Sequence, residues 1–270
     1  MKYLTILLFP FLAYSQTKYS PIIEDEKLQI ESSSRTVFIR SYINADTDSA
    51  VRSTGIILKG GYILTNEHVM RPHIKGEKVA FHVYTNGKKS FHKFDDLSIV
   101  GCDNENDICL LKTEKNYGDA FFSLETPSFR TITKEKPIGL FKEETIYFNG
   151  FCNDLPRMAK GKYIDFTSSA YEKISHQSRT YHTSAIHFAS PEGKRIACAG
   201  DSGGPLFDNN LYLYGMVRDT VTVDGIEKNL AVPVNVLRDF FNATKDSIKR
   251  DKIRTITSFS ELDLIFKKTN

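Results

Sequence analysis

The sequence predicts an all-β protein that ends in one helix, and three observations support this. Short runs rich in β-branched and aromatic residues recur along most of the chain. Turn residues, glycine among them, separate these runs, and helical periodicity is found only near the C-terminus. Many short strands separated by turns are typical of a β-barrel or a β-sandwich.

The predicted strands follow one another with no repeat of fixed period. They cover 36–40, 54–58, 62–65, 78–84, 97–100, 108–112, 145–149, 163–167, 181–188, 211–217 and 230–234. The pair Gly60-Gly61 separates the second run from the third, so we expect a hairpin there. Apolar residues then fall on one face over 234–248, which predicts a helix. A second, short helix is expected over 260–267.

The first residues predict export. A basic residue precedes an apolar run over 3–14, and Ala13 and Ser15 stand at the −3 and −1 positions of a signal-peptidase site. The run is shorter than the roughly 20 residues that span a bilayer, and Pro10 interrupts it. We therefore interpret residues 1–15 as a cleaved signal peptide, with an uncleaved membrane anchor as the alternative.

The mature chain is expected to be a soluble secreted or periplasmic protein with no stable membrane insertion, and residues 16–35 to be an irregular lead-in. Its 36 Lys and Arg against 33 Asp and Glu leave a formal charge of +3, too mild to indicate a nucleic-acid partner. No metal-binding spacing is found, so we expect neither metal nor cofactor. No feature predicts an oligomeric state.

The most informative segment is 199–206, Ala-Gly-Asp-Ser-Gly-Gly-Pro-Leu, in which glycines surround Ser202. Glycine lets the backbone approach a substrate and direct N–H groups at it, although the same residues also make a good turn. Two further segments accompany it. A strand over 63–67 runs into His68, and Asp107 precedes an apolar strand.

These three segments resemble those of the chymotrypsin-like (trypsin-like) serine peptidases, and 229–234 resembles the last strand of the bacterial members. The order His, Asp, Ser is also that of chymotrypsin. The resemblance spans about residues 36–245. It implies an all-β fold of two six-stranded antiparallel β-barrels with a C-terminal helix and the catalytic cleft between the barrels. We place the peptidase domain at 36–248 and a C-terminal extension at 249–270.

The resemblance implies an exported serine endopeptidase acting on a protein or peptide substrate. Ser202 would form an acyl-enzyme, His68 would act as general base and then general acid, and Asp107 would orient the imidazole. The backbone N–H groups of Gly200 and Ser202 would form the oxyanion hole. The neighbouring Asp103 does not share the Asp-Ile-x-Leu-Leu context of Asp107.

The same resemblance suggests the substrate pocket. Its base falls on Ile196, followed by Ala197, and Leu230 takes a wall position that is often glycine. An apolar base argues against selection of Lys or Arg, because a buried cation would face no carboxylate. We expect a small or medium apolar residue at the cleavage site. Arg218 and Thr220 lie where the family usually has Ser-Trp-Gly, with Arg218 expected close to the catalytic Asp.

The cysteines depart from the family pattern. Cys152 lies in a segment whose family counterpart runs beside the strand of Cys198, so the resemblance implies a Cys152–Cys198 disulfide, with two buried thiols as the alternative. Cys102 and Cys109 also lie close in sequence, but we expect strand geometry to oppose their pairing.

Asp201 is a second departure. In the animal enzymes the matching Asp pairs with an amino terminus released from a zymogen, and no such sequence exists here. A buried carboxylate is costly unless it is paired. We expect its partner to be a Lys, an Arg or the amino group exposed by signal cleavage. The favoured hypothesis is therefore a peptidase that needs no zymogen cleavage.

Two rival functions use the same residues. One is a peptidase-fold binding protein without turnover, against which the complete set of Gly200, Ser202, His68 and Asp107 weighs. The other is an esterase on the same fold, which no sequence feature separates from a peptidase.

Overall fold

The structure is a computed structural model that describes residues 26–42, 50–74, 80–87, 90–94, 97–113, 120–125, 143–152, 155–174, 179–223 and 226–250. Its helices are α1 (Glu26–Ser34), α2 (Glu67–Ile74) and α3 (Val234–Arg250). The strands of the N-terminal half are β1 (Thr36–Tyr42), β2 (Ala50–Leu58), β3 (Tyr62–Thr65), β4 (Ala80–Gly87), β5 (Ser90–Phe94), β6 (Leu97–Asp103) and β7 (Ile108–Thr113). Those of the C-terminal half are β8 (Thr145–Cys152), β9 (Leu155–Ile174), β10 (Arg179–Ala189), β11 (Pro205–Phe207), β12 (Leu213–Val223) and β13 (Ile226–Pro233).

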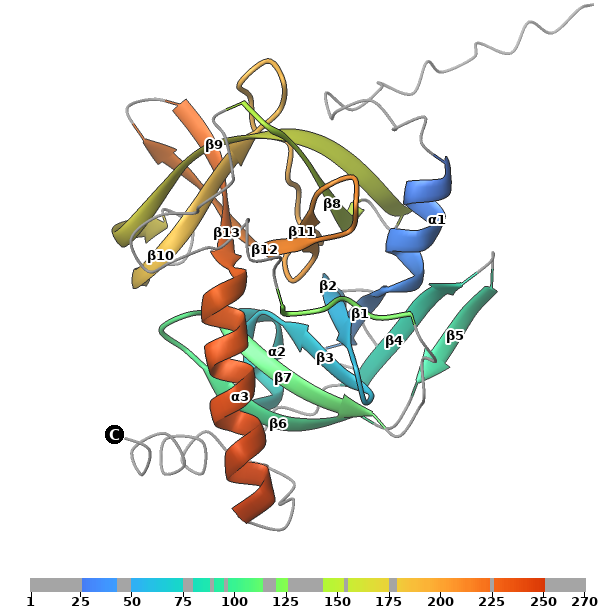
Figure 1. Ribbon diagram of the computed structural model, residues 1–270. Helices are drawn as coiled ribbons and strands as arrows, with labels where there is room; N and C mark the ends of the chain where they lie inside the picture. The colour runs from blue at the N-terminus through green and yellow to red at the C-terminus, as the bar shows by residue number, and fades with distance from the viewer. Residues whose placement is uncertain are drawn as a thin grey trace, which may run out of the picture.

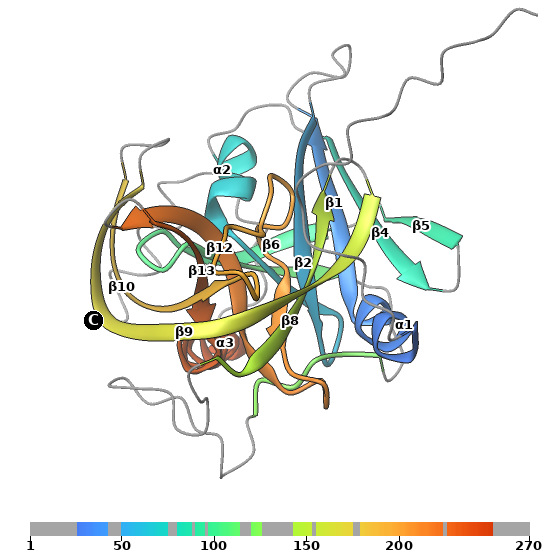
Figure 2. The ribbon, with the colours of Figure 1, turned by 90° about the horizontal axis from the view of Figure 1, so that it is seen from above.

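The C-terminal half is a closed barrel in the order β10-β13-β12-β11-β8-β9, and every pair is antiparallel. The long strand β9 curves around one side of the barrel, pairing with β8 at one end and β10 at the other (Figure 2). Inward side chains fill the barrel, among them Phe148 and Phe188 with ring centroids 5.5 Å apart. Closure leaves each strand with two neighbours, which removes exposed edges from most of this half.

The N-terminal half is a seven-stranded antiparallel sheet in the order β5-β4-β1-β2-β3-β7-β6. The all-β class with a C-terminal helix is therefore confirmed. The strand number of this half is larger than the six expected, because the hairpin of β4 and β5 adds to the edge of β1. The predicted β2–β3 hairpin is present, and Gly60 and Gly61 at its turn both have positive φ. Such φ values are strained for other residues.

The lead-in differs from the prediction, since residues 26–34 form helix α1 instead of irregular chain. Tertiary contacts hold this helix. Leu28, Ser32 and Ser33 are buried, and the Ser32 carbonyl accepts a hydrogen bond from the Thr36 hydroxyl at 2.8 Å. Ser32 Oγ also lies 3.3 Å from Asn149 Oδ1 of β8. Packing thus overrides a local sequence that has little amphipathic pattern.

Helix α3 confirms the helix predicted over 234–248. It leaves the barrel directly after β13 and runs along the N-terminal sheet (Figure 1). Leu237 and Phe240 are buried, and Phe241 makes an edge-to-face contact with Tyr62 of β3 at 5.4 Å between ring centroids. The helix therefore fastens the two halves together.

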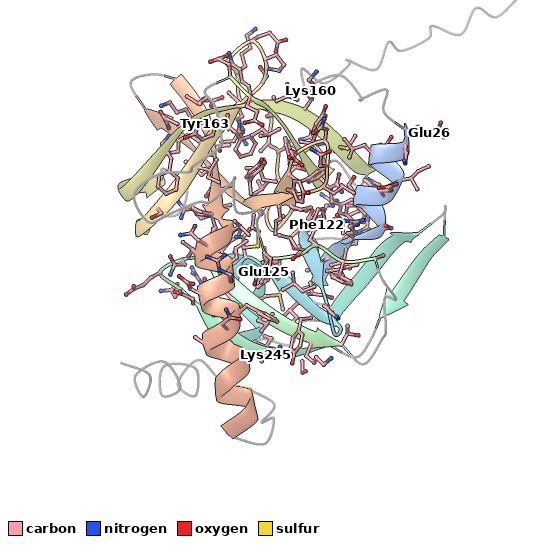
Figure 3. The ribbon with its side chains drawn as sticks, in the orientation of Figure 1. Glu26, Phe122, Glu125, Lys160, Tyr163 and Lys245 are labelled. Carbon is pink, nitrogen blue, oxygen red and sulfur yellow. A yellow bond between two sulfur atoms is a disulfide. The ribbon has the colours of Figure 1, made fainter. Side chains whose placement is uncertain are left out.

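A second link between the halves is Phe122, which lies where they meet (Figure 3). Its backbone N–H donates to the Ile57 carbonyl of β2 at 2.9 Å. Its ring packs on Phe207 of β11 with centroids 5.5 Å apart. The two halves consequently share buried apolar surface, the main stabilising contribution in such contacts.

The predicted signal peptide at 1–15, the lead-in up to residue 25 and the helix predicted at 260–267 lie outside the described residues. Within the described ranges, no helix is both long and apolar enough to span a bilayer.

Candidate active site

His68 and Asp107 form a hydrogen-bonded pair in the N-terminal half. His68 Nδ1 lies 2.8 Å from Asp107 Oδ2, and the backbone N–H of His68 donates to Asp107 Oδ1 at 2.9 Å. Asp107 is completely buried. Both carboxylate oxygens are thus engaged by the same histidine, which fixes the orientation of its ring.

The sheet places these two residues side by side. Strands β3 and β7 are antiparallel with Thr65 opposite Cys109, so the end of β3 meets the beginning of β7. His68 follows β3 in the first turn of α2, and Asp107 directly precedes β7. Asp107 has a φ of 57°, a left-handed conformation that Asp tolerates better than most residues. Asn66 Nδ2 donates to the Asp107 carbonyl at 2.9 Å and holds this backbone in place.

The neighbouring acidic residues have other contacts. Asp103 Oδ1 accepts the backbone N–H groups of Glu105 and Asn106 at 2.9 and 3.0 Å, which makes it a turn residue. Glu67 is buried and forms a bidentate ion pair with Arg71. Burial raises the pKa of Glu67, while Arg71 opposes the rise. Among these carboxylates, only that of Asp107 is hydrogen-bonded to His68.

Ser202 lies in a tight loop of the C-terminal half that requires glycine. Gly200 and Gly203 have φ values of 105° and 85°. A Cβ on Gly200 would lie 2.0 Å from the Phe151 carbonyl oxygen, and one on Gly203 would lie 1.9 Å from that of Thr54. Other residues at either position would therefore combine backbone strain with a clash. The glycines flanking the serine are demanded by this geometry.

Ser202 Oγ donates to the backbone carbonyl of Arg218 at 3.2 Å. Across the described part of the chain, the structure shows no hydrogen bond between Ser202 and His68. Catalytic hydrogen bonds are often long before a substrate binds. The loop of Ser202 nevertheless packs against the end of β3, three residues before His68, because the position of a Cβ on Gly203 lies only 2.7 Å from Thr65 Oγ1.

Thr54 of β2 holds the serine loop from the opposite half. Its backbone N–H donates to the Ser202 carbonyl and its hydroxyl donates to the Gly200 carbonyl, both at 2.8 Å. Its own carbonyl accepts the Thr65 hydroxyl at 2.8 Å. A chain of buried hydrogen bonds thus connects the strand before His68 to the loop of Ser202.

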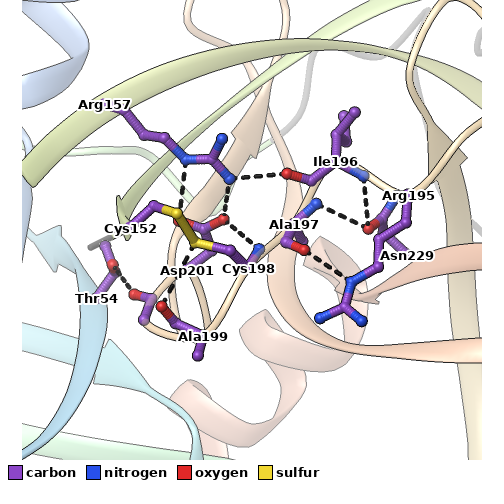
Figure 4. Close-up of a disulfide and its surroundings, with 11 residues drawn as sticks. Thr54, Cys152, Arg157, Arg195, Ile196, Ala197, Cys198, Ala199, Asp201 and Asn229 are labelled. Atoms are coloured by element: carbon purple, nitrogen blue, oxygen red, sulfur yellow. Dashed lines mark hydrogen bonds and ion pairs between the residues drawn. A yellow bond between two sulfur atoms is a disulfide. The ribbon is translucent and has the colours of Figure 1, made fainter. Parts of the chain in front are cut away.

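Asp201 finds its partner within the barrel, and the partner is Arg157 of β9 (Figure 4). The guanidinium pairs with the buried carboxylate and also donates to the Ile196 carbonyl at 2.8 Å. The backbone N–H of Cys198 donates to Asp201 Oδ2 at 2.8 Å. Burial raises the pKa of Asp201, while Arg157 and the backbone hydrogen bonds oppose the rise. Of the expected partners, an Arg occupies the position.

Asn229 of β13 holds the segment that leads into this loop (Figure 4). Its Oδ1 accepts the backbone N–H groups of Ile196 and Ala197 at 3.3 and 2.9 Å, and its Nδ2 donates to the Phe188 carbonyl at 2.8 Å. Asn229 is fully buried. The side-chain amide of Asn229 therefore fixes the position of the backbone at Ile196, Ala197 and Phe188.

The residues expected around the substrate pocket are spread over three elements. Ile196 and Ala197 are buried in the segment before the loop, and Arg218 is completely buried on β12. Thr220 of β12 is opposite Asn229, and Leu230 is opposite Asp219 and His187. Asn229, not Leu230, is thus the cross-strand neighbour of Thr220.

Each half contains one disulfide. Cys152 of β8 is bonded to Cys198, three residues before Asp201, with Cα atoms 5.9 Å apart (Figure 4). This pairing confirms the expected one. Cys102 and Cys109 are also bonded, which corrects the expectation that strand geometry would oppose them. They stand directly opposite each other on β6 and β7 with Cα atoms 4.1 Å apart, because antiparallel pairing brings opposed residues close together.

The electrostatics favour a charged histidine. Burial by itself lowers the pKa of His68, but the carboxylates of Asp107, Asp219 and Glu67 outweigh it, so the pKa is raised. Asp219 immediately follows Arg218 on β12. Burial raises the pKa of Asp219 in turn, while the Thr220 N–H and His68 oppose the rise. Three carboxylates therefore act on the imidazole, those of Asp107 and Glu67 from the N-terminal half and that of Asp219 from the C-terminal half.

The sequence did not single out five residues that hold or influence the site, namely Thr54, Asn66, Arg157, Asp219 and Asn229. Only Arg157 had a signal, since a cationic partner for Asp201 was expected without a position. The other four are ordinary residues of strands or turns, and their roles depend on partners distant in the chain.

Comparison with known proteins assigns this chain to a family. The model of the trypsin family matches residues 28–240. The active form of the Rv3671c protease from M. tuberculosis aligns with a TM-score of 0.56 at 18% identity, over 87% of this chain and 92% of that one. The HtrA-type protease AlgW, solved with a tripeptide, aligns with a TM-score of 0.54 at 16% identity, over 80% of this chain and 62% of that one. Identities this low show a shared fold. No curated protein sequence matches the chain.

Proposed function

The chain belongs to the trypsin family of serine endopeptidases, and on that premise we propose that Ser202, His68 and Asp107 are its catalytic triad. The observation that carries the proposal is the buried His68–Asp107 pair, with 2.8 Å between Nδ1 and Oδ2, beside the glycine-bounded loop of Ser202. A serine hydroxyl is a weak nucleophile and needs such a base.

In the proposed reaction, His68 Nε2 takes the Ser202 proton while Oγ forms a bond to the substrate carbonyl carbon. The imidazolium then gives that proton to the leaving amine, and the peptide C–N bond breaks to leave an acyl-enzyme. Water, deprotonated by the same histidine, hydrolyses the ester and restores Ser202. Asp107 keeps the proton on Nδ1 and stabilises the imidazolium throughout.

The N–H groups of Gly200 and Ser202 are proposed to bind the oxyanion. Among the described residues neither N–H has a protein acceptor, whereas the intervening Asp201 N–H donates to the Cys198 carbonyl at 3.1 Å. Preorganised donors of this kind typically contribute about 3 kcal/mol each to lowering the barrier. The bonds from Thr54 to the carbonyls of Gly200 and Ser202 support this arrangement.

The enzyme is further proposed to need no cleavage that creates a new amino terminus. Arg157 already supplies the cation beside Asp201, from within the folded barrel. Mature protein beginning at Gln16 should therefore be active. If only a further trimmed form is active, this part of the proposal is wrong.

Export through the signal at 1–15 is part of the proposal. Two disulfides among the described residues fit an oxidising compartment, either secreted or periplasmic. The proposed substrate is a protein or peptide with a small or medium apolar residue at the cleavage site, since Ile196 and Ala197 bring no charge there.

Labelling with a fluorophosphonate probe tests the triad. Wild type should be labelled, Ser202→Ala should not, and the exposed Ser123→Ala serves as the matched control that stays labelled. A peptide-library digest then separates the functions. Labelling without peptide cleavage but with ester hydrolysis would indicate the esterase, and absence of Ser202-dependent labelling would indicate the binding protein.

A further inference from the structure

Strand β12 has an open edge next to Ser202. It pairs with β13 from Gly215 to Val223 but with β11 only from Leu213 to Met216. Within the ranges that the structure describes, no strand lies on the β11 side of residues 218–220. Open strand edges bind extended peptides by adding a strand.

The register of such a peptide follows from the serine. Ser202 Oγ donates to the Arg218 carbonyl, so a residue whose carbonyl is attacked by Ser202 (P1) lies beside Arg218. An added strand that runs antiparallel, as β11 and β13 both do, then places the preceding residue (P2) opposite Asp219. The residue before that (P3) falls opposite Thr220.

Asp219 is the charged side chain that the P2 residue meets. Side chains of directly opposed residues lie on the same face of a sheet, with Cβ atoms about 5 Å apart. Asp219 is partly exposed, whereas the preceding Arg218 is completely buried. A substrate approaching from solvent therefore meets the carboxylate before the guanidinium.

We propose that Asp219 is a specificity-determining residue that selects Lys or Arg at P2. The inference rests on the proposed function, because the register is counted from the attack of Ser202. One carboxylate oxygen, Oδ1, accepts the Thr220 N–H at 2.7 Å, and this bond orients the group. A cation at P2 would pair with the carboxylate at the mouth of the site.

The surroundings leave Asp219 in need of a cation. Burial raises the pKa of its carboxyl, which reflects poor hydration of the anion, and Asp107 adds repulsion. His68 and Arg218 act in the opposite sense. His68, however, must be neutral to accept the Ser202 proton, so a cationic substrate residue supplies a positive charge that the imidazole does not provide.

The experiment compares peptides that differ only at P2, carrying Lys, Gln or Glu, with the P1 residue taken from the library digest. Wild type should cleave the Lys peptide with a kcat/KM about fivefold above that of the Gln peptide, the size of a partly exposed ion pair. Asp219→Asn should remove that ratio, and Asp219→Lys should reverse it in favour of Glu. Asp239→Asn, which removes an exposed carboxylate from α3, is the matched control and should keep the wild-type ratio.

The outcomes separate this inference from the one it rests on. The role of Asp219 is overturned if wild type cleaves the Lys and Gln peptides with equal kcat/KM, or if the preference for the Lys peptide survives in Asp219→Asn. Either result leaves the proposed function standing as long as Ser202-dependent labelling persists. Loss of that labelling in wild type removes the proposed function and this inference with it. If Asp219 had a purely structural role, its replacement would lower kcat/KM equally for the Lys, Gln and Glu peptides. The preference would then not change from Lys to Glu in Asp219→Lys.

Discussion

The two halves of the molecule hold the residues of the proposed triad in different ways. In the N-terminal half, His68 and Asp107 lie where β3 ends and β7 begins, and they bind each other directly. In the C-terminal half, Ser202 sits in a loop whose neighbours are held by contacts from elsewhere. An ion pair from β9, an amide from β13, a disulfide to β8 and a hydroxyl from β2 all converge there.

The difference teaches that antiparallel strand pairing is enough to place His68 beside Asp107, whereas the loop of Ser202 needs contacts from several distant elements. A loop has few backbone hydrogen bonds of its own and opens easily unless side chains hold it. The N-terminal pair should therefore be sensitive to changes in its own two residues. The serine loop should be sensitive to many residues, each with a smaller effect.

The largest expected effect follows from breaking the pair. Asp107→Asn should lower kcat by roughly 10,000-fold, because an amide stabilises the wrong histidine tautomer. Steady-state peptide hydrolysis measures this. Asp103→Asn, which alters a turn carboxylate close in sequence, should stay within about tenfold of wild type. Equal losses in the two variants would contradict the assignment.

The next effect tests the serine loop. Arg157→Met leaves the buried Asp201 carboxylate without its cation, and it should lower the free energy of unfolding by about 3–5 kcal/mol. The double variant with Asp201→Asn should recover part of that loss. Urea unfolding provides the measurement.

The control for this change is Lys162→Met, which breaks the more exposed ion pair with Glu143. It should cost no more than about 1 kcal/mol. A similar loss in both variants would mean that the Arg157–Asp201 pair has no special weight.

Removal of each disulfide should have an effect of intermediate size, and it compares the C-terminal half with the N-terminal half. They close 46 residues at Cys152–Cys198 and 7 residues at Cys102–Cys109. Replacing both cysteines by serine should cost about 4 kcal/mol for the longer loop and about 2 kcal/mol for the shorter one, by loop-closure entropy. Only the first replacement should also lower the rate of fluorophosphonate labelling, because the Cys152–Cys198 bond holds the backbone whose N–H binds Asp201 next to Ser202. Labelling that is slowed equally by both would weaken the contrast between the halves.

The smallest effect concerns pH. The pKa of His68 is raised despite burial, and the neutral form is the base, so activity should fall as pH falls through that raised value. Its contribution to stability has the opposite sign. A raised pKa stabilises the fold fully below the unfolded value of about 6.5, and this contribution is lost as pH rises through the folded value.

Asp219→Asn should move the acid limb of kcat/KM to lower pH, since it removes one carboxylate that favours imidazolium. Asp239→Asn should leave the limb in place. A shift to higher pH in Asp219→Asn would show that the Asp219 carboxylate does not act on the imidazole as described.

The local pattern of apolar and turn residues was enough to predict the strand runs, the β2–β3 hairpin and the helix after β13. The same pattern could not predict helix α1. Two of the residues that this helix buries, Ser32 and Ser33, are polar and are covered only by tertiary contacts. The glycines at 200 and 203 could be read from the sequence because a tight loop restricts the residue type at its own positions. Cys152–Cys198 was expected only through the resemblance.

By itself, then, the sequence determined the class of fold, the family and the residue types clustered around Ser202. These depend on alternation, turn chemistry and motifs within a few neighbouring residues. Only the tertiary structure decided that Arg157 faces Asp201, that Thr54 reaches Gly200 across 146 positions, and that Asp219 is partly exposed whereas Arg218 is completely buried. The physical reason is that such contacts depend on strand register and on how the two halves pack, and neither leaves a local mark on the chain.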